Sequence, residues 1–204
     1  MLSSISPVGE ASRGQRWSVT AAAYLVASII GGAVVFGLAG AVGRLAAWLG
    51  AAAGWELPRP LGLVLLGLAA VGALLVDAGR MPGRLPSWQR QVDERWLDDF
   101  RGWVYGAGFG AQLGGAVFTR IPTAATHLLL LLALASGSTA TGALLGASFG
   151  LVRALPLLTT ARLRDPAGLQ RYHRALDRRS SLAQRITEVT VAAVAAALFV
   201  GAAV

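Results

Sequence analysis

The chain contains no cysteine and no lysine, and only two of its 204 residues are histidine. Without cysteine it forms no disulfides, transfers no electrons through a dithiol and binds no metal through thiolates. Because the chain has only two histidines, we expect no haem or metal centre built on imidazole, and we predict no metal and no cofactor. We also find no Ser-His-Asp order, no paired intramembrane carboxylates and no phosphate-binding motif, so an enzyme is the least favoured hypothesis.

Charged residues are scarce as well, at 14% of the chain against about a quarter in soluble domains. Mean hydropathy is +0.60. A membrane-spanning helix needs about 20 apolar residues. Apolar runs of suitable length occupy 19–49, 61–78, 103–136, 139–161 and 186–204. The predicted fold is an all-α integral membrane protein with about five transmembrane helices, of which the first and third must tilt, protrude or break because of their length.

The polar segment 79–103 carries an apolar residue every three or four positions, at Trp88, Val92, Trp96, Phe100 and Trp103. This period predicts an amphipathic helix. The helix would lie in the membrane interface with its tryptophans among the headgroups, or it would pack on the protein's own surface. Segment 162–185 has a weaker pattern of the same kind and seven arginines.

The arginines are distributed unevenly among the polar segments. Two lie in the N-terminal tail (1–18), five in 79–102 and seven in 162–185, against two in 43–60. Five spans with a cytoplasmic N-terminus place the arginine-rich segments on the cytoplasmic side, as the positive-inside rule requires. This pattern predicts a bacterial inner-membrane protein. These segments would contact anionic lipid headgroups, and no nucleic acid is expected. In the alternative topology, 103–136 is a hairpin turning at TRIPT (119–123), which gives six spans.

Similar short stretches recur along the chain. GGAVVF (31–36) resembles GGAVF (114–118), and the same offset of 83 aligns LGLVLLG (61–67) with LLGASFG (144–150). These matches predict parallel repeat units over 19–102 and 103–185, followed by a final helix at 186–204, within a single transmembrane domain of residues 19–204. Chance similarity in an Ala/Gly/Leu-rich sequence is the competing explanation.

Small residues spaced four apart mark helix faces that allow close approach of two backbones. Two such stripes occur, at Gly106, Gly110 and Gly114 and at Gly142, Gly146 and Gly150. They predict a tight bundle. Sequence leaves open whether each stripe packs inside the chain or against another subunit, in a homo-oligomer or with a membrane-protein partner.

The stretch GGAVFTRIPTAATH (114–127) places polar groups inside the third apolar run. Pro122 would break or kink the helix there. An arginine in the bilayer costs about 3 kcal/mol and normally has a partner. In one interpretation Arg120, Thr123, His127 and, less directly, Gln112 line a polar path; in the other, Arg120 snorkels to the outer interface. Arg153 would likewise snorkel inward or pair with Asp77.

A small-residue helix interrupted by proline within a repeated core resembles the CcdA/DsbD-type bacterial membrane transporters. Only Pro122, and less clearly Pro156, match their helix breaks, and the paired cysteines of the redox members are absent. The resemblance implies a transport scaffold without thiol chemistry. The leading hypothesis is therefore a small-solute or anion transporter or permease component. The alternative is a non-catalytic membrane subunit or assembly factor, which docks a partner through its glycine stripes and Trp-rich helix.

Overall fold

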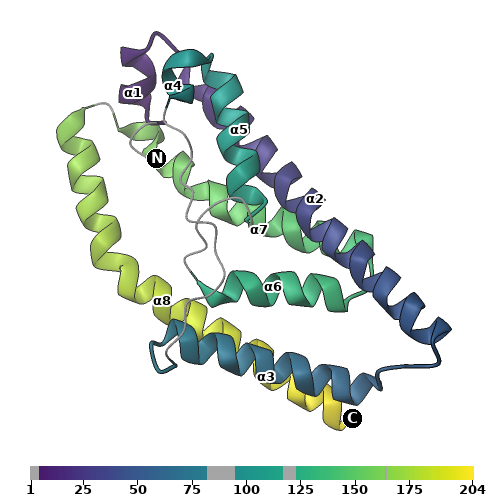
Figure 1. Ribbon diagram of the computed structural model, residues 1–204. Helices are drawn as coiled ribbons and strands as arrows, with labels where there is room; N and C mark the ends of the chain where they lie inside the picture. Colours follow the sequence, from purple (N-terminus) through teal and green to yellow (C-terminus); the bar gives the residue numbers. More distant parts are fainter. Residues whose placement is uncertain (1–4, 82–94, 117–122, 164) are drawn as a thin grey trace.

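The computed structural model describes residues 5–81, 95–116, 123–163 and 165–204, and within these ranges it contains helices and turns but no strand. The all-α prediction is confirmed for this part of the chain. The helices are α1 (Pro7–Ser12), α2 (Trp17–Ala52), α3 (Arg59–Asp77), α4 (Trp96–Asp99), α5 (Gly102–Gly114), α6 (Ala124–Ala135), α7 (Thr139–Thr159) and α8 (Pro166–Ala203), with a 3₁₀ turn at Thr160–Arg162 (Figure 1).

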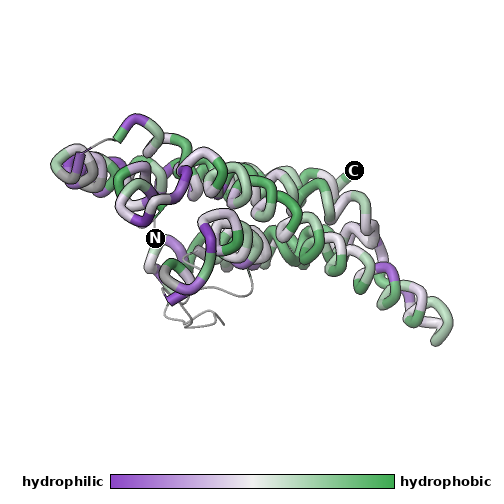
Figure 2. The backbone as a smooth tube through the Cα atoms, turned by 90° about the horizontal axis from the view of Figure 1, so that it is seen from above, coloured by the Kyte–Doolittle hydropathy of each residue, from purple (hydrophilic) through white to green (hydrophobic). Residues whose placement is uncertain are grey.

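Four of the described helices are long and apolar enough to cross a membrane, namely α2, α3, α7 with the following turn, and the apolar part of α8. A fifth apolar helix, α6, is shorter, with 12 residues. Most residues along the long helices are hydrophobic, and hydrophilic residues gather mostly toward the end where α1 and the start of α8 lie (Figure 2). These are the features of a membrane protein.

Helix α2 is the centre of the tightest part of the bundle, where α5 runs parallel to it. Gly106, Gly110 and Gly114 of α5 face the backbone of Thr20, Tyr24 and Ser28, so both helices advance by four residues together. A Cβ atom on these glycines would lie 1.9–2.6 Å from the carbonyl oxygens of α2. The first glycine stripe therefore packs inside the chain.

The second stripe packs on α2 from α7, which runs antiparallel. Gly150, Gly146 and Gly142 face Ser28, Gly32 and Phe36 in turn. The Ser28 hydroxyl donates a 2.9 Å hydrogen bond to the Gly150 carbonyl and is fully buried, which satisfies a polar group at the crossing. Both stripes are thus used within one chain and are not available to another subunit.

Helices α3 and α8 form a second, antiparallel pair, in which Phe199 of α8 lies over Gly67 of α3. Helix α6 joins this pair to the α2 bundle: Leu128 packs with Ala70, Val191 and Ala195, while Leu134 at its other end faces Gly43 of α2. Figure 1 shows α6 lying between the two groups of helices.

The predicted long segment at 103–136 is two helices, α5 and α6, rather than one continuous helix. Helix α5 ends at Gly114, and Ala116 then adopts φ 58°, a left-handed conformation that stops the helix and that alanine adopts at a cost of about 1–2 kcal/mol. Gly114 lies at Ser28 of α2 and Leu134 lies at Gly43, so α5 and α6 advance in the same direction along α2. Two helices of a hairpin would run in opposite directions.

Helix α8 also differs from expectation, because the predicted amphipathic segment 162–185 and final helix 186–204 are largely one helix of 38 residues. Asp165 accepts a hydrogen bond from the Gly168 N–H and begins the helix, Pro166 occupies its first turn, and no proline follows. Polar residues such as Arg, Gln and Ser do not end a helix, so a change of polarity does not mark its boundary.

Candidate functional site

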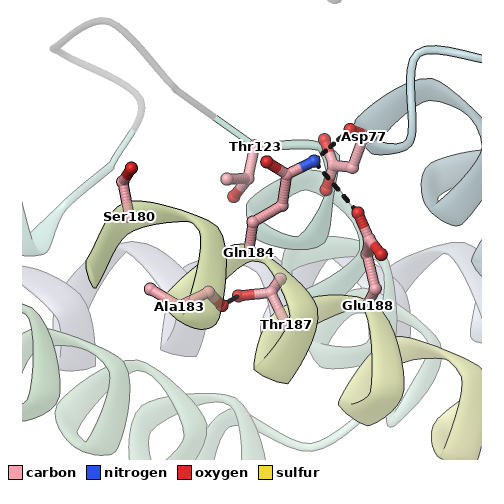
Figure 3. Close-up of a pocket in the computed structure, with 7 residues that line it drawn as sticks. All are labelled: Asp77, Thr123, Ser180, Ala183, Gln184, Thr187 and Glu188. Atoms are coloured by element: carbon pink, nitrogen blue, oxygen red, sulfur yellow. Dashed lines mark hydrogen bonds between the residues drawn. The ribbon is translucent and has the colours of Figure 1, made fainter. Parts of the chain in front are cut away.

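A polar cavity lies where the end of α3, the start of α6 and the middle of α8 meet (Figure 3). Its volume is about 400 Å³. Seven described residues line it, and six of them carry polar side chains: Asp77, Thr123, Ser180, Ala183, Gln184, Thr187 and Glu188. Within the part of the chain that the structure describes, this cavity lined by polar side chains is suited to hold a small ligand.

Asp77, the last residue of α3, holds the start of α6 in place. Its carboxylate accepts hydrogen bonds from the backbone N–H groups of Ala124 at 2.7 Å and Ala125 at 3.3 Å. The first N–H groups of a helix have no partner within the helix, and a carboxylate there also interacts favourably with the helix dipole. Thr123 precedes α6, but its side chain makes no capping hydrogen bond. Asp77 caps the helix instead, from 47 positions before Ala124.

Gln184 of α8 connects the two acidic residues of the cavity. Its side-chain nitrogen donates to the backbone oxygen of Asp77 at 3.3 Å and to Glu188 Oε1 at 3.0 Å. Figure 3 shows this nitrogen between the end of α3 and the Glu188 carboxylate. The amide therefore fixes α8 relative to α3 at the cavity and orients Glu188.

A second polar group lies around Glu10, at the junction of α1, α2 and α5. Glu10 is fully buried. Its Oε1 accepts from the Tyr105 hydroxyl and from Arg13 Nη2 at 2.7 Å, and its Oε2 accepts from the Thr20 hydroxyl at 2.6 Å. Partial burial disfavours the charged form of Arg13, but the hydrogen bonds to Glu10 and Tyr105 outweigh it, and the pKa of Arg13 is raised.

This group serves to hold the N-terminal segment on the bundle rather than to receive a ligand, because its buried carboxylate is satisfied by protein donors. Two further bonds act in the same way. Trp17 donates its indole N–H to the Ile5 carbonyl at 3.3 Å, and Gln15 accepts from the Gly102 N–H at the start of α5 at 3.1 Å.

The residues predicted to line a path do not all meet in the described structure. Arg120 and Pro122 lie outside the described residues. Thr123 lines the cavity, and His127 lies in the first turn of α6, half-buried. Gln112 is half-buried on α5.

The proposed pair of Arg153 and Asp77 is not brought together. Asp77 binds the start of α6, whereas the guanidinium of Arg153 lies over the Phe149 ring, 5.5 Å from its centroid. The aromatic face gives this cation a partner on its own helix.

Gln184, Glu188 and Glu10 were not predicted from the sequence as site residues. A carboxylate two residues inside the last apolar run was the available signal for Glu188, because acidic residues in such runs are costly and tend to be functional. Glu10 stands in a short polar tail, where no comparable signal exists. Among the residues that the structure describes, no group of three or more His, Cys, Asp or Glu side chains is arranged to hold a metal ion.

The chain is similar to one curated protein, the methylamine utilization protein MauF of Paracoccus versutus, at 31% identity over 157 residues. The aligned region covers 76% of this chain and 55% of MauF, so the chain spans about half the length of its relative. No family model and no solved structure matches.

The match corrects the predicted resemblance to CcdA/DsbD-type transporters, which is wrong. That resemblance rested on proline-interrupted, small-residue helices. Such helices satisfy general packing requirements in membranes and do not identify a family. Nothing in the comparisons links this chain to that group, and the similarity extends instead over most of the chain to MauF.

Proposed function

We propose that this protein is a non-catalytic membrane subunit or assembly factor of a methylamine utilization system, which docks a partner protein. The similarity to MauF over 76% of the chain carries this proposal. The apolar helices agree with it, since four of those described suit a membrane protein. The MauF match gives no comparable support to a transporter.

In this proposal the chain crosses a bacterial inner membrane five times, with α5 and α6 together forming the third crossing and the N-terminus in the cytoplasm. The common direction of α5 and α6 along α2 supports five crossings over six. The arginine-rich first half of α8 then lies on the cytoplasmic side. Its arginines at 171, 174, 178, 179 and 185 are exposed, which suits contact with anionic lipid headgroups.

The glycine stripes are excluded from the docking surface because they pack on α2 of the same chain. The Trp-rich segment remains the better candidate. In its described part Trp96 stacks on Phe109 of α5 with ring centroids 6.1 Å apart, whereas Phe100 and Trp103 are exposed. Phe100 directly follows α4 and Trp103 lies in the first turn of α5. Exposed aromatic side chains are typical anchors of protein interfaces.

Transport of a small solute is the second candidate function, and the polar cavity is the observation that favours it. The path would include Thr123, which lines the cavity, together with Arg120, His127 and Gln112. A pathway for an anion is the less favoured form, because the described lining of the cavity contains two carboxylates and no basic side chain.

Deleting the gene from its native host tests the proposal. We expect growth with methylamine as the substrate to be lost and growth on a substrate without an amine to be unchanged, with a plasmid copy restoring growth. Uptake of labelled methylammonium by the deletion strain separates the two candidates. Loss of a docking subunit leaves the initial rate of uptake unchanged, whereas loss of a methylammonium transporter lowers it. Normal growth of the deletion strain on methylamine would contradict both the proposed docking role and transport of methylammonium.

A further inference from the structure

We propose that the cavity between α3, α6 and α8 binds a small primary ammonium ion such as methylammonium. This inference deepens the proposed role in methylamine utilization and rests on it. The charge of the described lining favours a cation. Asp77 and Glu188 bring two carboxylates to the described lining from different helices, and none of the described lining residues is basic. In a chain with a net charge of +8, this local excess of negative charge selects cations.

The hydrogen-bond capacity of the lining also favours an ammonium ion. A carboxylate offers about four acceptor positions, and an ammonium group carries three N–H donors. The Asp77 carboxylate accepts two backbone N–H groups, and Gln184 binds Oε1 of Glu188, so both carboxylates retain capacity for further donors. The hydroxyl of Thr123 and the side-chain oxygen of Gln184 add neutral acceptors at the same cavity.

The described lining suits an ammonium ion better than a metal ion. Calcium and magnesium require six or more oxygen ligands in close array, whereas the described residues offer no group of three or more acidic or histidine ligands. A primary ammonium ion needs only three acceptors and a small apolar surface. The lining includes Ala183, Thr123 and Thr187, which carry methyl groups suited to that role, and about 400 Å³ accommodates the ion with several waters.

Isothermal titration of methylammonium chloride into the full-length protein in detergent tests the inference. We expect saturable binding, and binding of tetramethylammonium weaker by about tenfold or more, because it has no N–H to donate to the carboxylates. Glu188→Gln removes one charge with little change in shape and should weaken binding by about tenfold. Glu56→Gln is the matched control, since Glu56 is exposed in the loop between α2 and α3, and it should bind as the wild type does.

Absence of saturable binding to the wild type, or equal binding of methylammonium and tetramethylammonium, would overturn the inference without relying on any variant. Equal affinity of Glu188→Gln and the wild type would also overturn it. The proposed function fails separately, through normal growth of the deletion strain on methylamine. Loss of growth combined with no binding therefore refutes the ammonium site alone.

Discussion

Replacing Gly146 by alanine is expected to lower the melting temperature of the protein sharply, with a loss of about 3 kcal/mol or more in the free energy of unfolding. A Cβ atom at this position would lie 2.0 Å from the Gly32 carbonyl oxygen and 2.7 Å from Phe36 Cβ. The first neighbour is backbone inside a helix, so it cannot turn away as a flexible side chain would. The two helices must separate at Ser28–Phe36, where their packing is tightest.

Gly72→Ala is the matched control, because Gly72 lies within α3 and a Cβ atom there would meet nothing within 4 Å. Alanine favours a helix over glycine by about 1 kcal/mol, so this variant should be as stable as the wild type or more stable. The amount of monodisperse protein left after heating, measured by size-exclusion chromatography in detergent, gives both melting temperatures. If Gly146→Ala had the same melting temperature as the wild type, the packing of α7 on α2 would be contradicted.

Removing the Glu10 side chain is expected to release α1 from the bundle and to cost about 3 kcal/mol, the lower end of the range for breaking a buried ion pair. In Glu10→Ala, the Tyr105 and Thr20 hydroxyls and Arg13 lose their common acceptor. The lower end applies because the Arg13 side chain is 23% exposed and can reach water. Hydrogen exchange should increase over residues 5–20 and remain unchanged in the α3–α8 pair.

Glu10→Gln and Glu56→Gln serve as comparison variants. Glu10→Gln keeps the shape and tests the charge, so we expect a smaller loss than in Glu10→Ala. Glu56 is exposed, and its replacement should leave exchange at residues 5–20 unchanged. If Glu10→Ala exchanged like the wild type over these residues, the buried carboxylate would not be what holds α1.

Local patterns in the sequence predicted the parts of this fold that depend on local chemistry. Apolar runs of sufficient length predicted α2, α3 and α7 within a few residues of their observed ends. The spacing of four predicted that Gly106, Gly110 and Gly114 share one face. It did not predict which helix that face meets or in which direction, because those depend on contacts between residues about 86 positions apart, such as Gly114 and Ser28.

The candidate site was largely unpredictable for the same reason. Asp77 stood out only as an acid at the end of an apolar run, and its role depends on Ala124, 47 residues later. Thr123, which was predicted to line a polar path, is one of the cavity's lining residues, but its neighbours there, Gln184 and Glu188, come from α8. The α5–α6 break was signalled by Pro122, but the described α5 already ends at Gly114, before the proline.

We expect the chain to cross the membrane with its arginine-rich segments together on the cytoplasmic side. Because the natural sequence has no cysteine, Arg171→Cys and Trp55→Cys each introduce a single thiol, both at exposed positions. An impermeant maleimide is applied to intact cells and to inverted vesicles. We expect the thiol at 55 to be labelled in intact cells and the thiol at 171 to be labelled only in inverted vesicles. Labelling at 171 in intact cells would contradict it.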